Sequence, residues 1–281
     1  MKKSFLILVS VFLLSSVLLA QEFSVNVGML SLPGKYKTNF YTQKFVDGVQ
    51  SPYGSLVQDS KDFNVNVMLV NLSLMKATEI EALQYGMSFG FSSADTVELD
   101  SYYTPAYTSD MTGIFRGSVY SFASRKYDYT MDVNVMPVMG QVSYAVVKNE
   151  KLTLNAGIGV GVYAYLINTK EKSVYTFTED VGDYKEGETD VYVDENEQFF
   201  VKPAMELNIT GNYALTERFF VGLNVGVVNV ADLQISKSYS KEHINNDYDD
   251  LTEVTKNYES EESRTIGGLG YKAGIDIGVR F

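Results

Sequence analysis

Alternation between apolar and polar residues, with a period of two, runs through this sequence and strongly limits the folds open to it. In residues 152–166 the apolar positions run from Leu152 through Ile158 to Leu166, and glycine, asparagine, threonine or tyrosine lies between them. Residues 269–281 repeat the pattern and end on Phe281. Successive side chains of a strand point to opposite faces, so each stretch predicts a β-strand with one apolar face and one small or polar face.

Eight such segments follow one another, and the connections between them alternate in length. We place the segments at residues 22–33, 62–76, 79–98, 126–147, 152–172, 197–215, 219–240 and 264–281. Tight polar turns at 76–79, 148–151 and 216–218 alternate with long loops near 34–61, 99–125, 173–196 and 241–263. Short turns at one end and long loops at the other are typical of transmembrane barrels, with periplasmic turns and extracellular loops. The predicted fold is all-β: a closed antiparallel up-and-down transmembrane β-barrel of eight strands.

Two other architectures remain open at this point. Residues 113–123 could pair within the second long loop, which would give a ten-stranded barrel. A soluble periplasmic barrel also alternates, with its apolar face turned inward. The polar face of these segments is mostly glycine, asparagine, serine and threonine, which suits a crowded lumen better than a water-exposed surface. We therefore expect the apolar face to point outward into lipid.

Some segments change phase once along their length. The apolar positions shift by one residue at Val227 and Val228, and again around Pro137. An extra residue in one strand of an antiparallel pair produces such a shift, and proline within a sheet is often found at such irregularities. We therefore predict β-bulges at these two places.

Aromatic residues give an independent indication of a membrane. Those expected to face outward near the periplasmic rim are Phe23, Tyr144, Tyr213, Phe219 and Phe281. Aromatic residues form girdles at both interfaces of transmembrane barrels. The second girdle would include Tyr271, Phe63, Phe91 and Tyr127.

The first twenty residues have the features of a secretory signal peptide. Lys2 and Lys3 precede an apolar run over residues 5–19, and the small residue Ala20 precedes polar Gln21. The run is shorter than the ~20 residues that a transmembrane helix needs. We expect a signal peptide over 1–20, an outer-membrane barrel domain over 21–281, and export to the cell outer membrane.

In these features, the chain resembles the small eight-stranded outer-membrane β-barrel proteins, the group that contains the OmpA transmembrane domain and OmpX. The last strand carries Lys272, Gly274, Ile277 and Val279 and ends in Phe281, similar to the assembly signal of that family. The resemblance implies that the barrel-insertion machinery recognises this strand and that the folded chain contacts outer-membrane lipid. Val279 lies two residues before the terminal Phe281, which departs from the family's spacing.

Composition excludes several functional classes. The sequence has no cysteine, one histidine and a formal net charge of -12, so thiol chemistry, a multi-histidine metal site and general nucleic-acid binding are not expected. The one histidine, His243, lies in a polar loop without the packing that a catalytic histidine needs. Residues 245–256 start like a calcium loop, but Asp250 and Lys256 occupy its glycine and glutamate positions. Weak divalent binding by clustered carboxylates stays open, but we expect no catalytic residue, cofactor or specific metal site.

Charged residues on the predicted lumen face form the candidate internal site. They are Asp132, Lys202, Glu206, Lys272, Asp276 and Arg280. Isolated charges there would be costly, so we expect them to pair across strands. An eight-stranded lumen is just wide enough for side chains to fill it. The hypothesis is a plugged barrel, and a narrow porin-like channel for small solutes or hydrophobic molecules is the alternative.

The long loops carry most of the charge. Residues 168–197 hold ten acidic and three basic residues, and residues 237–264 hold eight and four, for formal charges of -7 and -4. Val174, Phe177, Val191 and Val193 alternate around a polar tip, which predicts a hairpin above the membrane. Tyrosines also occur in the loops and could bind other proteins (Tyr36, Tyr41, Tyr53, Tyr102, Tyr103, Tyr107). We therefore predict a non-enzymatic envelope protein with a structural or surface-interaction role; its surface ligand is unknown.

Overall fold

The computed structural model describes residues 21–46, 49–50, 55–80, 82–104, 123–178, 180, 183–246 and 253–281, without side chains at 39–50, 55–59, 101–104, 237–246 and 253–261. The described secondary structure is all β. No helix in this part of the chain is long and apolar enough to cross a membrane. The predicted signal peptide at 1–20 and nearly all of residues 113–123 lie outside the described residues.

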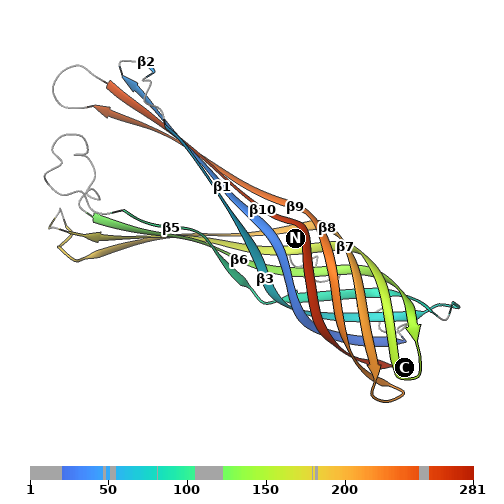
Figure 1. Cartoon of the computed structure of the whole chain (residues 1–281). Coiled ribbons are helices and arrows are strands. Elements are labelled where there is room, and N and C mark those ends of the chain that lie inside the picture. The colour runs from blue at the N-terminus through green and yellow to red at the C-terminus, as the bar shows by residue number, and fades with distance from the viewer. Residues whose placement is uncertain are drawn as a thin grey trace.

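The strands form one closed antiparallel ring (Figure 1). Their bounds are β1 Glu22–Val46, β2 Val49–Gln50, β3 Ser55–Ala77, β4 Leu83–Ser92, β5 Asp95–Thr104, β6 Ala123–Lys148, β7 Leu152–Phe177, β8 Thr189–Ala214, β9 Phe219–Asn246 and β10 Glu253–Arg280. β4 and β5 occupy one position because both pair with β6, and β10 pairs with β1 to close the ring. The ring therefore has eight strand positions, which confirms the predicted fold. The second and third tight turns lie where they were predicted, whereas the first lies between Ala77 and Leu83, slightly later than the predicted 76–79.

The irregularities of the ladders differ from the two predicted bulges. Val227 and Val228 pair with β10 and β8 without any shift of register, so the prediction there is wrong. β6 and β7 also pair continuously through Pro137, and the break lies in the neighbouring strand instead, where β4 gives way to β5 at residues 93–94. A marked shift lies between Ile266 and Gly268 of β10, where Gly267 and Gly268 have φ of 144° and 88°. Glycine adopts such positive angles without steric cost.

In the lower half of the ring, next to the short turns, apolar side chains point outward as predicted. Met29 on β1 and Leu223 on β9 are exposed at 63% and 66%, and Ile158 on β7 at 53%. Most inner positions of the same strands are polar or glycine, such as Ser24, Asn26 and Gly157, and Phe220 of β9 is an apolar exception. The outward apolar stretches span about ten residues per strand, the length that a tilted membrane-crossing strand needs.

In the upper half the polarity of the two faces is reversed, so that the inner face becomes apolar and the outer face becomes polar. On β1 the inner positions become Leu30, Leu32 and Tyr36, all buried, while Lys35 and Lys37 lie outside. Corresponding changes occur on the other long strands, and they explain the phase change at Val227 and Val228: Val228 is the first inward apolar residue of β9 above the polar positions Gly222, Asn224 and Gly226. The upper interior is a continuous apolar core that includes Val65, Val67, Tyr129, Met131, Val133, Tyr165, Ile167, Val230, Leu233 and Ile266.

Above the membrane segment the ring opens into two four-stranded sheets. β8 and β9 stop pairing at Ala204 and Val230, and β3 pairs with β4 only from Leu69 downward. We call β9, β10, β1 and β3 above these points the first upper sheet, and β5, β6, β7 and β8 the second upper sheet. The two diverge from the barrel in Figure 1. Most of the four predicted long loops are thus extended strands, and the predicted hairpin is confirmed because β7 and β8 pair up to Thr176 and Thr189.

Candidate functional site: the lumen and the upper sheets

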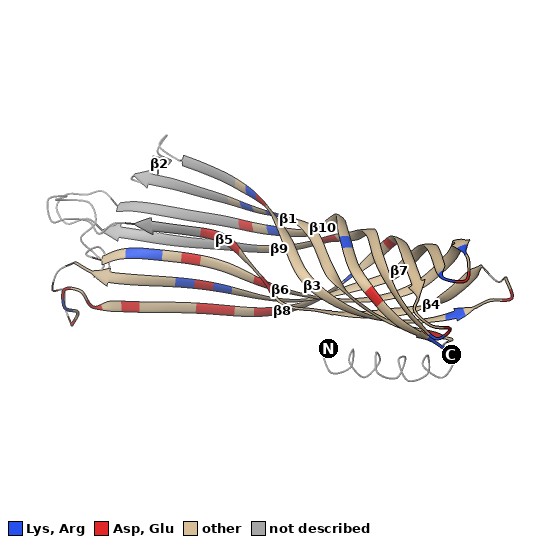
Figure 2. Cartoon of the chain, turned by 60° about the horizontal axis from the view of Figure 1, so that its bottom comes forward, with Lys and Arg blue, Asp and Glu red and all other residues tan. Residues whose placement is uncertain are grey.

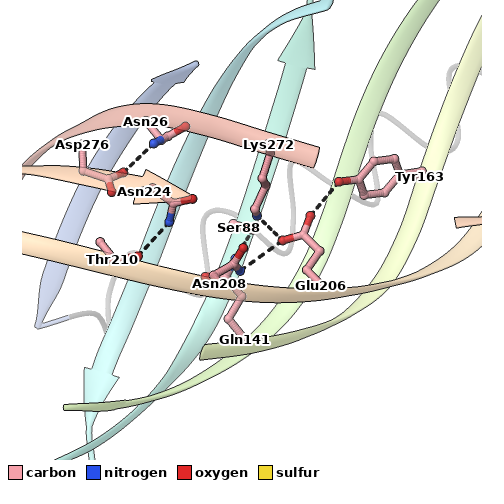
Figure 3. A network of polar contacts seen from close by, with 10 residues as sticks. All are labelled: Asn26, Ser88, Gln141, Tyr163, Glu206, Asn208, Thr210, Asn224, Lys272 and Asp276. Carbon is pink, nitrogen blue, oxygen red and sulfur yellow. Dashed lines mark hydrogen bonds and ion pairs between the residues drawn. The ribbon is translucent and has the colours of Figure 1, made fainter. Parts of the chain in front are cut away.

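The lower lumen contains a polar network centred on Glu206 of β8 (Figure 3). The Tyr163 hydroxyl donates to Glu206 Oε1 at 2.6 Å, and Asn208 Nδ2 donates to Oε2 at 3.3 Å. The Lys272 ammonium forms an ion pair with the same carboxylate, and their side chains are only 11% and 2% exposed. A buried carboxylate is tolerated when a charge and several donors satisfy it, and Glu206 has both.

Glycine on β9 makes this ion pair possible. Glu206 and Lys272 come from β8 and β10, which lie on either side of β9. Gly226 stands between Asn208 and Lys272 in the ladders, and a Cβ built there would lie 2.4 Å from Asn208 Oδ1 and 3.2 Å from Lys272 Cε. The missing side chain leaves room for the lysine to reach across the middle strand.

Three further side-chain pairs line the same cavity, whose volume is about 80 Å³. Asn26 Nδ2 donates to Asp276 Oδ1 at 2.9 Å, Asn224 Nδ2 to Thr210 Oγ1 at 2.7 Å, and Gln141 Nε2 to Ser88 Oγ at 2.9 Å. A space of this size holds a few water molecules. The lower lumen is thus nearly filled by paired polar side chains.

At the periplasmic end, an ion pair lies beside the terminal strands. Arg280 Nε donates to Glu22 Oε2 at 3.1 Å, and the Arg280 guanidinium lies over the Phe220 ring at 5.0 Å. A second cavity at this mouth shares Glu22, Gln84 and Asn155 with the lumen cavity. The polar cavity therefore lies next to the cavity at the periplasmic mouth.

An apolar plug lies directly above the polar network. Tyr163, Tyr165, Leu30 and Val228 are completely buried, and Met139 is 1% exposed. These residues belong to the apolar core, which continues upward between the two upper sheets. The sequence interpretation missed this core because it treated the phase changes as bulges. The signal that could have found it is that all long strands exchange faces at corresponding heights.

Five of the six predicted lumen charges face inward, and one does not. Lys202 lies opposite Tyr163 in the ladder, and Glu206, Lys272, Asp276 and Arg280 occupy inner positions. Asp132 is on the outside, where it accepts a hydrogen bond from Thr96 Oγ1 at 2.5 Å, so its predicted lumen position is wrong. The physical reason is the exchange of faces: at Asp132 the inner neighbours are Met131 and Val133, both fully buried.

The aromatic residues predicted for the two girdles also differ in direction: most face outward, and two face the interior. Tyr144, Tyr213, Phe219, Tyr271 and Phe281 point outward with 47–83% exposure, and Phe23 is partly exposed on the outer face of β1. Phe91 is also exposed, at 46%. Phe63 and Tyr127, predicted for the second girdle, instead pack against the upper apolar core. Both lie above the height at which the faces exchange, so the prediction is wrong for these two.

Four of the five assembly-signal residues lie on β10, and the fifth, Phe281, directly follows its last residue, Arg280. Lys272 and Gly274 face the lumen, and Ile277, Val279 and Phe281 occupy the alternate positions facing outward. β10 pairs with β9 on one side and β1 on the other in the finished ring. Recognition of this strand by the insertion machinery stays a prediction.

Among the described residues, Arg264 is a buried cation in the interior between the upper sheets. Arg264 is 4% exposed, and its guanidinium lies 4.5 Å from the Tyr129 ring centre. Tyr36 meets Tyr129 edge-on at 6.1 Å, and Arg264 Nη2 lies 3.4 Å from Glu262 Oε2. Burial lowers the pKa of Arg264, and burial together with Glu262 and Asp100 raises the pKa of Tyr36. Sequence reasoning did not single out Arg264 as a site residue.

Among the described residues, charged residues are concentrated on the upper strands and the turns, whereas the membrane segment has few (Figure 2). On the β7–β8 hairpin, Lys170 pairs with Glu195 at 2.7 Å and Lys185 with Asp180 at 3.0 Å. The Glu186 amide and the Lys185 side chain both donate to Asp180, which lowers the pKa of its carboxyl. Phe177 and Tyr184 stack at 4.2 Å below the tip. The predicted acidic hairpin is therefore an ordered extension of the barrel.

The predictions for His243 and for divalent binding by the carboxylates of residues 245–256 concern residues with little or no described structure. The backbone of His243 pairs with Lys256, but the His243 side chain lies outside the described residues, as do residues 247–252. Within the described part of the chain, no three histidine, cysteine, aspartate or glutamate residues are grouped as a metal site.

The architecture identifies the compartment. A closed ring with an apolar exterior about ten residues high, short turns at one end and long extensions at the other is the architecture of outer-membrane barrels. The chain is therefore an outer-membrane β-barrel protein, with its upper sheets outside the cell.

Comparison with known proteins gives structural similarity only. No protein-family model and no curated protein matches the chain. The outer-membrane protein OprG from Pseudomonas aeruginosa is 12% identical over 93% of this chain and 97% of its own, with a TM-score of 0.38. The outer-membrane protease OmpT from Escherichia coli is 11% identical over 91% of this chain and 97% of its own, with a TM-score of 0.31. Ail, the attachment invasion locus protein of Yersinia pestis, is 9% identical over 86% of this chain and 97% of its own, with a TM-score of 0.27. Similarity at this level carries no functional argument.

Proposed function

We propose that this protein is a non-enzymatic outer-membrane barrel that acts through its two upper sheets, in a structural or surface-interaction role outside the cell. The observation that carries the proposal is the apolar plug between the polar lumen and the upper sheets. Fully buried Leu30, Tyr163, Tyr165 and Val228 occupy the place that a conducting path would need.

The upper sheets supply the surface for such a role. Strand pairing continues to Val46 and Val254 in the first upper sheet and to Thr176 and Thr189 in the second. A tether to the membrane does not require this length of paired strand. The charge of -7 over residues 168–197 favours partners with a basic surface.

A cell-binding experiment tests the surface role. Cells that display the full chain would be compared with cells displaying a variant in which a short turn joins Lys170 to Glu195, with expression matched by heat-modifiable gel migration. We expect the full chain to increase attachment to amine-coated surfaces, and the increase to be lost in the shortened variant and at high salt. Equal attachment by both variants at low salt would reject a role for this hairpin.

A narrow channel is the second candidate, because the polar cavity lies beside a second cavity at the periplasmic mouth and shares Glu22, Gln84 and Asn155 with it. Planar bilayer recordings separate the two functions. A plugged barrel should give no steady conductance, and replacement of Tyr165 by glycine should create openings only if the plug is what blocks flow. Steady, large conductance from the unchanged protein would contradict the proposed function.

The non-enzymatic assignment rests on the state of the inner carboxylates. Glu206 is bound by Tyr163, Asn208 and Lys272. Asp276 Oδ1 accepts a hydrogen bond from Asn26, whereas Asp276 Oδ2 has no hydrogen-bond partner. The contacts of Glu206 suit a structural group better than a general acid or base facing a substrate. An assay with lipid and peptide substrates in detergent is the test: turnover that disappears on replacing Glu206 by glutamine would overturn the assignment.

A further inference from the structure

Three buried oxygen atoms in the lower lumen accept no hydrogen bond from the described part of the chain. They are Asp276 Oδ2, Asn212 Oδ1 and Asn208 Oδ1, and all three residues line the polar cavity of about 80 Å³. Asp276 is only 6% exposed and Asn212 only 4%. A buried acceptor that meets neither a donor nor a cation is costly. Among the described side chains, the unsatisfied buried atoms of the lower lumen are thus all acceptors.

Asn212 and Asp276 belong to one row of residues across three strands. Gly222 of β9 pairs with Asn212 of β8 on one side and with Asp276 of β10 on the other. A Cβ built on Gly222 would lie 2.1 Å from Asn212 Oδ1, so the amide oxygen lies over the middle strand, on the side of Asp276. Asn26 of β1 donates to Asp276 Oδ1 from the opposite side of β10 (Figure 3). Oδ2 is therefore the carboxylate oxygen available to a group held above Gly222.

The charges around the cavity do not balance. Glu206 pairs with Lys272, and Glu22 pairs with Arg280. Asp276 has no ion pair with a described residue, since the ammonium of Lys272, four positions before it on the same face, is bound to Glu206. A buried charge is tolerated when an opposite charge compensates it. The lower lumen therefore has one carboxylate in excess.

We propose that the lower lumen binds one monovalent metal cation, such as sodium, beside Asp276. Asp276 Oδ2 and Asn212 Oδ1 are its protein ligands, and water in the cavity completes its coordination. Carboxylate and carbonyl oxygens are the ligands that hard cations prefer. The ion compensates the excess carboxylate and satisfies two of the three unpaired oxygens. This site goes beyond the surface role and does not depend on it, because it lies in the membrane segment and is measured by a different experiment.

Charge and position favour a monovalent ion that enters from the periplasm. A divalent ion would leave an excess positive charge next to one carboxylate and near Lys272. Within the described residues, no three histidine, cysteine, aspartate or glutamate side chains are grouped to hold such an ion. The cavity lies beside the cavity at the periplasmic mouth, and the apolar plug lies on its other side.

Urea unfolding of the unchanged protein in detergent tests the proposal. Sodium chloride is exchanged for choline chloride at constant ionic strength, because the methyl groups of choline prevent direct coordination by oxygen. A ligand that binds only the folded protein increases the folding equilibrium constant by 1 + [L]/Kd, so above its Kd each tenfold increase in sodium should raise this constant about tenfold. Equal stability in the two salts would mean that water or a proton satisfies Asp276, and would overturn the proposal. A greater rise with calcium chloride at the same ionic strength would indicate a divalent site and would also overturn it.

Three variants locate the ion. Asp276→Asn keeps the shape of the side chain and removes its charge, so its stability should be the same in sodium and choline. Asp132→Asn is the matched control, because it makes the same change on the outer face, and it should retain the full sodium dependence. Asn212→Ala removes one ligand, so its stabilisation should begin at a higher sodium concentration than in the unchanged protein.

Heat-modifiable gel migration establishes that each variant is folded. If Asp276→Asn does not fold, Asp276→Ser takes its place with the same expected result. A sodium dependence that persists without the Asp276 carboxylate would place the ion elsewhere and overturn the proposal. If Asn212→Ala loses the same stability in both salts and keeps the original sodium dependence, the Asn212 amide is a hydrogen-bond donor to Asp276 and the proposed coordination is rejected.

Discussion

The lower and upper halves of this protein are built from the same strands but have opposite arrangements of polar and apolar residues. The lower half is apolar outside and polar inside, and the upper half is polar outside and apolar inside. In the membrane segment, Ile158 of β7 faces outward at 53% exposure and the interior is polar, whereas nine residues further along the strand Ile167 is completely buried. Both arrangements remove apolar surface from water. The difference shows that the medium at each height determines which face of a strand carries the apolar residues. The exchange of faces therefore marks the edge of the membrane.

The two halves also differ in what fills the interior. The lower lumen depends on polar pairs, such as Lys272 with Glu206, in which each partner needs the other. The upper interior depends mainly on apolar packing, with Arg264 as its buried charge. Substitutions should therefore act through loss of charge compensation below and through cavities above.

The largest effect should come from breaking the lower pair. Lys272→Met leaves the Glu206 carboxylate buried without its cation, and removing one partner of a buried pair costs about 3–5 kcal/mol. We expect this loss in the free energy of unfolding, measured by urea titration in detergent. The double variant with Glu206→Gln should recover a large part of it. No loss in the single variant would mean that the lower interior does not depend on charge compensation.

The next effect tests the apolar packing of the upper half. Ile167→Ala removes a completely buried side chain, and such changes typically cost about 2–5 kcal/mol through lost burial and the remaining cavity. The same urea titration measures it. Asn168→Ala, the next position on the outer face of β7, is the control and should change stability by less than about 0.5 kcal/mol. Equal effects would show that the upper interior is loosely packed.

A lipid-facing charge locates the boundary between the halves. Leu223 lies at the centre of the outward apolar stretch of β9, so Leu223→Arg should cost about 2–4 kcal/mol. Gln234→Arg places the same charge on the outer face of the same strand above the exchange of faces, and should cost less than about 0.5 kcal/mol. Refolding into lipid vesicles followed by urea titration compares the two. Similar costs would place the membrane edge higher than proposed.

The smallest effect concerns the exposed tip of the β7–β8 hairpin. The pKa of Asp180 is lowered by the Glu186 amide and by Lys185, so the charged carboxylate stabilises the tip. This contribution is fully present above the unfolded pKa, about 3.9, and is lost as the pH falls through the lower folded value. Carboxyl NMR titration should show the depressed pKa, and Lys185→Met should raise it. Global stability should not follow this titration, because the tip lies far from both interiors.

Local alternation explains why so much of the fold could be predicted from the sequence. Strand positions, tight turns and the β7–β8 hairpin depend on a period-two pattern that neighbouring residues carry themselves. Whether a polar residue faces inward or outward could not be predicted in this way. Asp132 and Lys202 are both charged, and only their height relative to the membrane distinguishes the outward Asp132 from the inward Lys202. The Glu206–Lys272 pair also needs Gly226 on the strand between them. Arg264 becomes a site residue only when β8 and β9 separate, which no short stretch of sequence specifies.

Closure of the ring by β1 and β10 has a consequence for the order of assembly. Arg280 and Glu22, which form an ion pair, are separated by 258 positions along the chain. Contacts between such distant segments form slowly, because almost the whole chain must be brought together before they can contribute. Until then, the outward apolar stretches and the open edges of β1 and β10 are exposed and prone to aggregate. A chain of this design therefore requires protection during transit, and its final step is the meeting of its first and last strands.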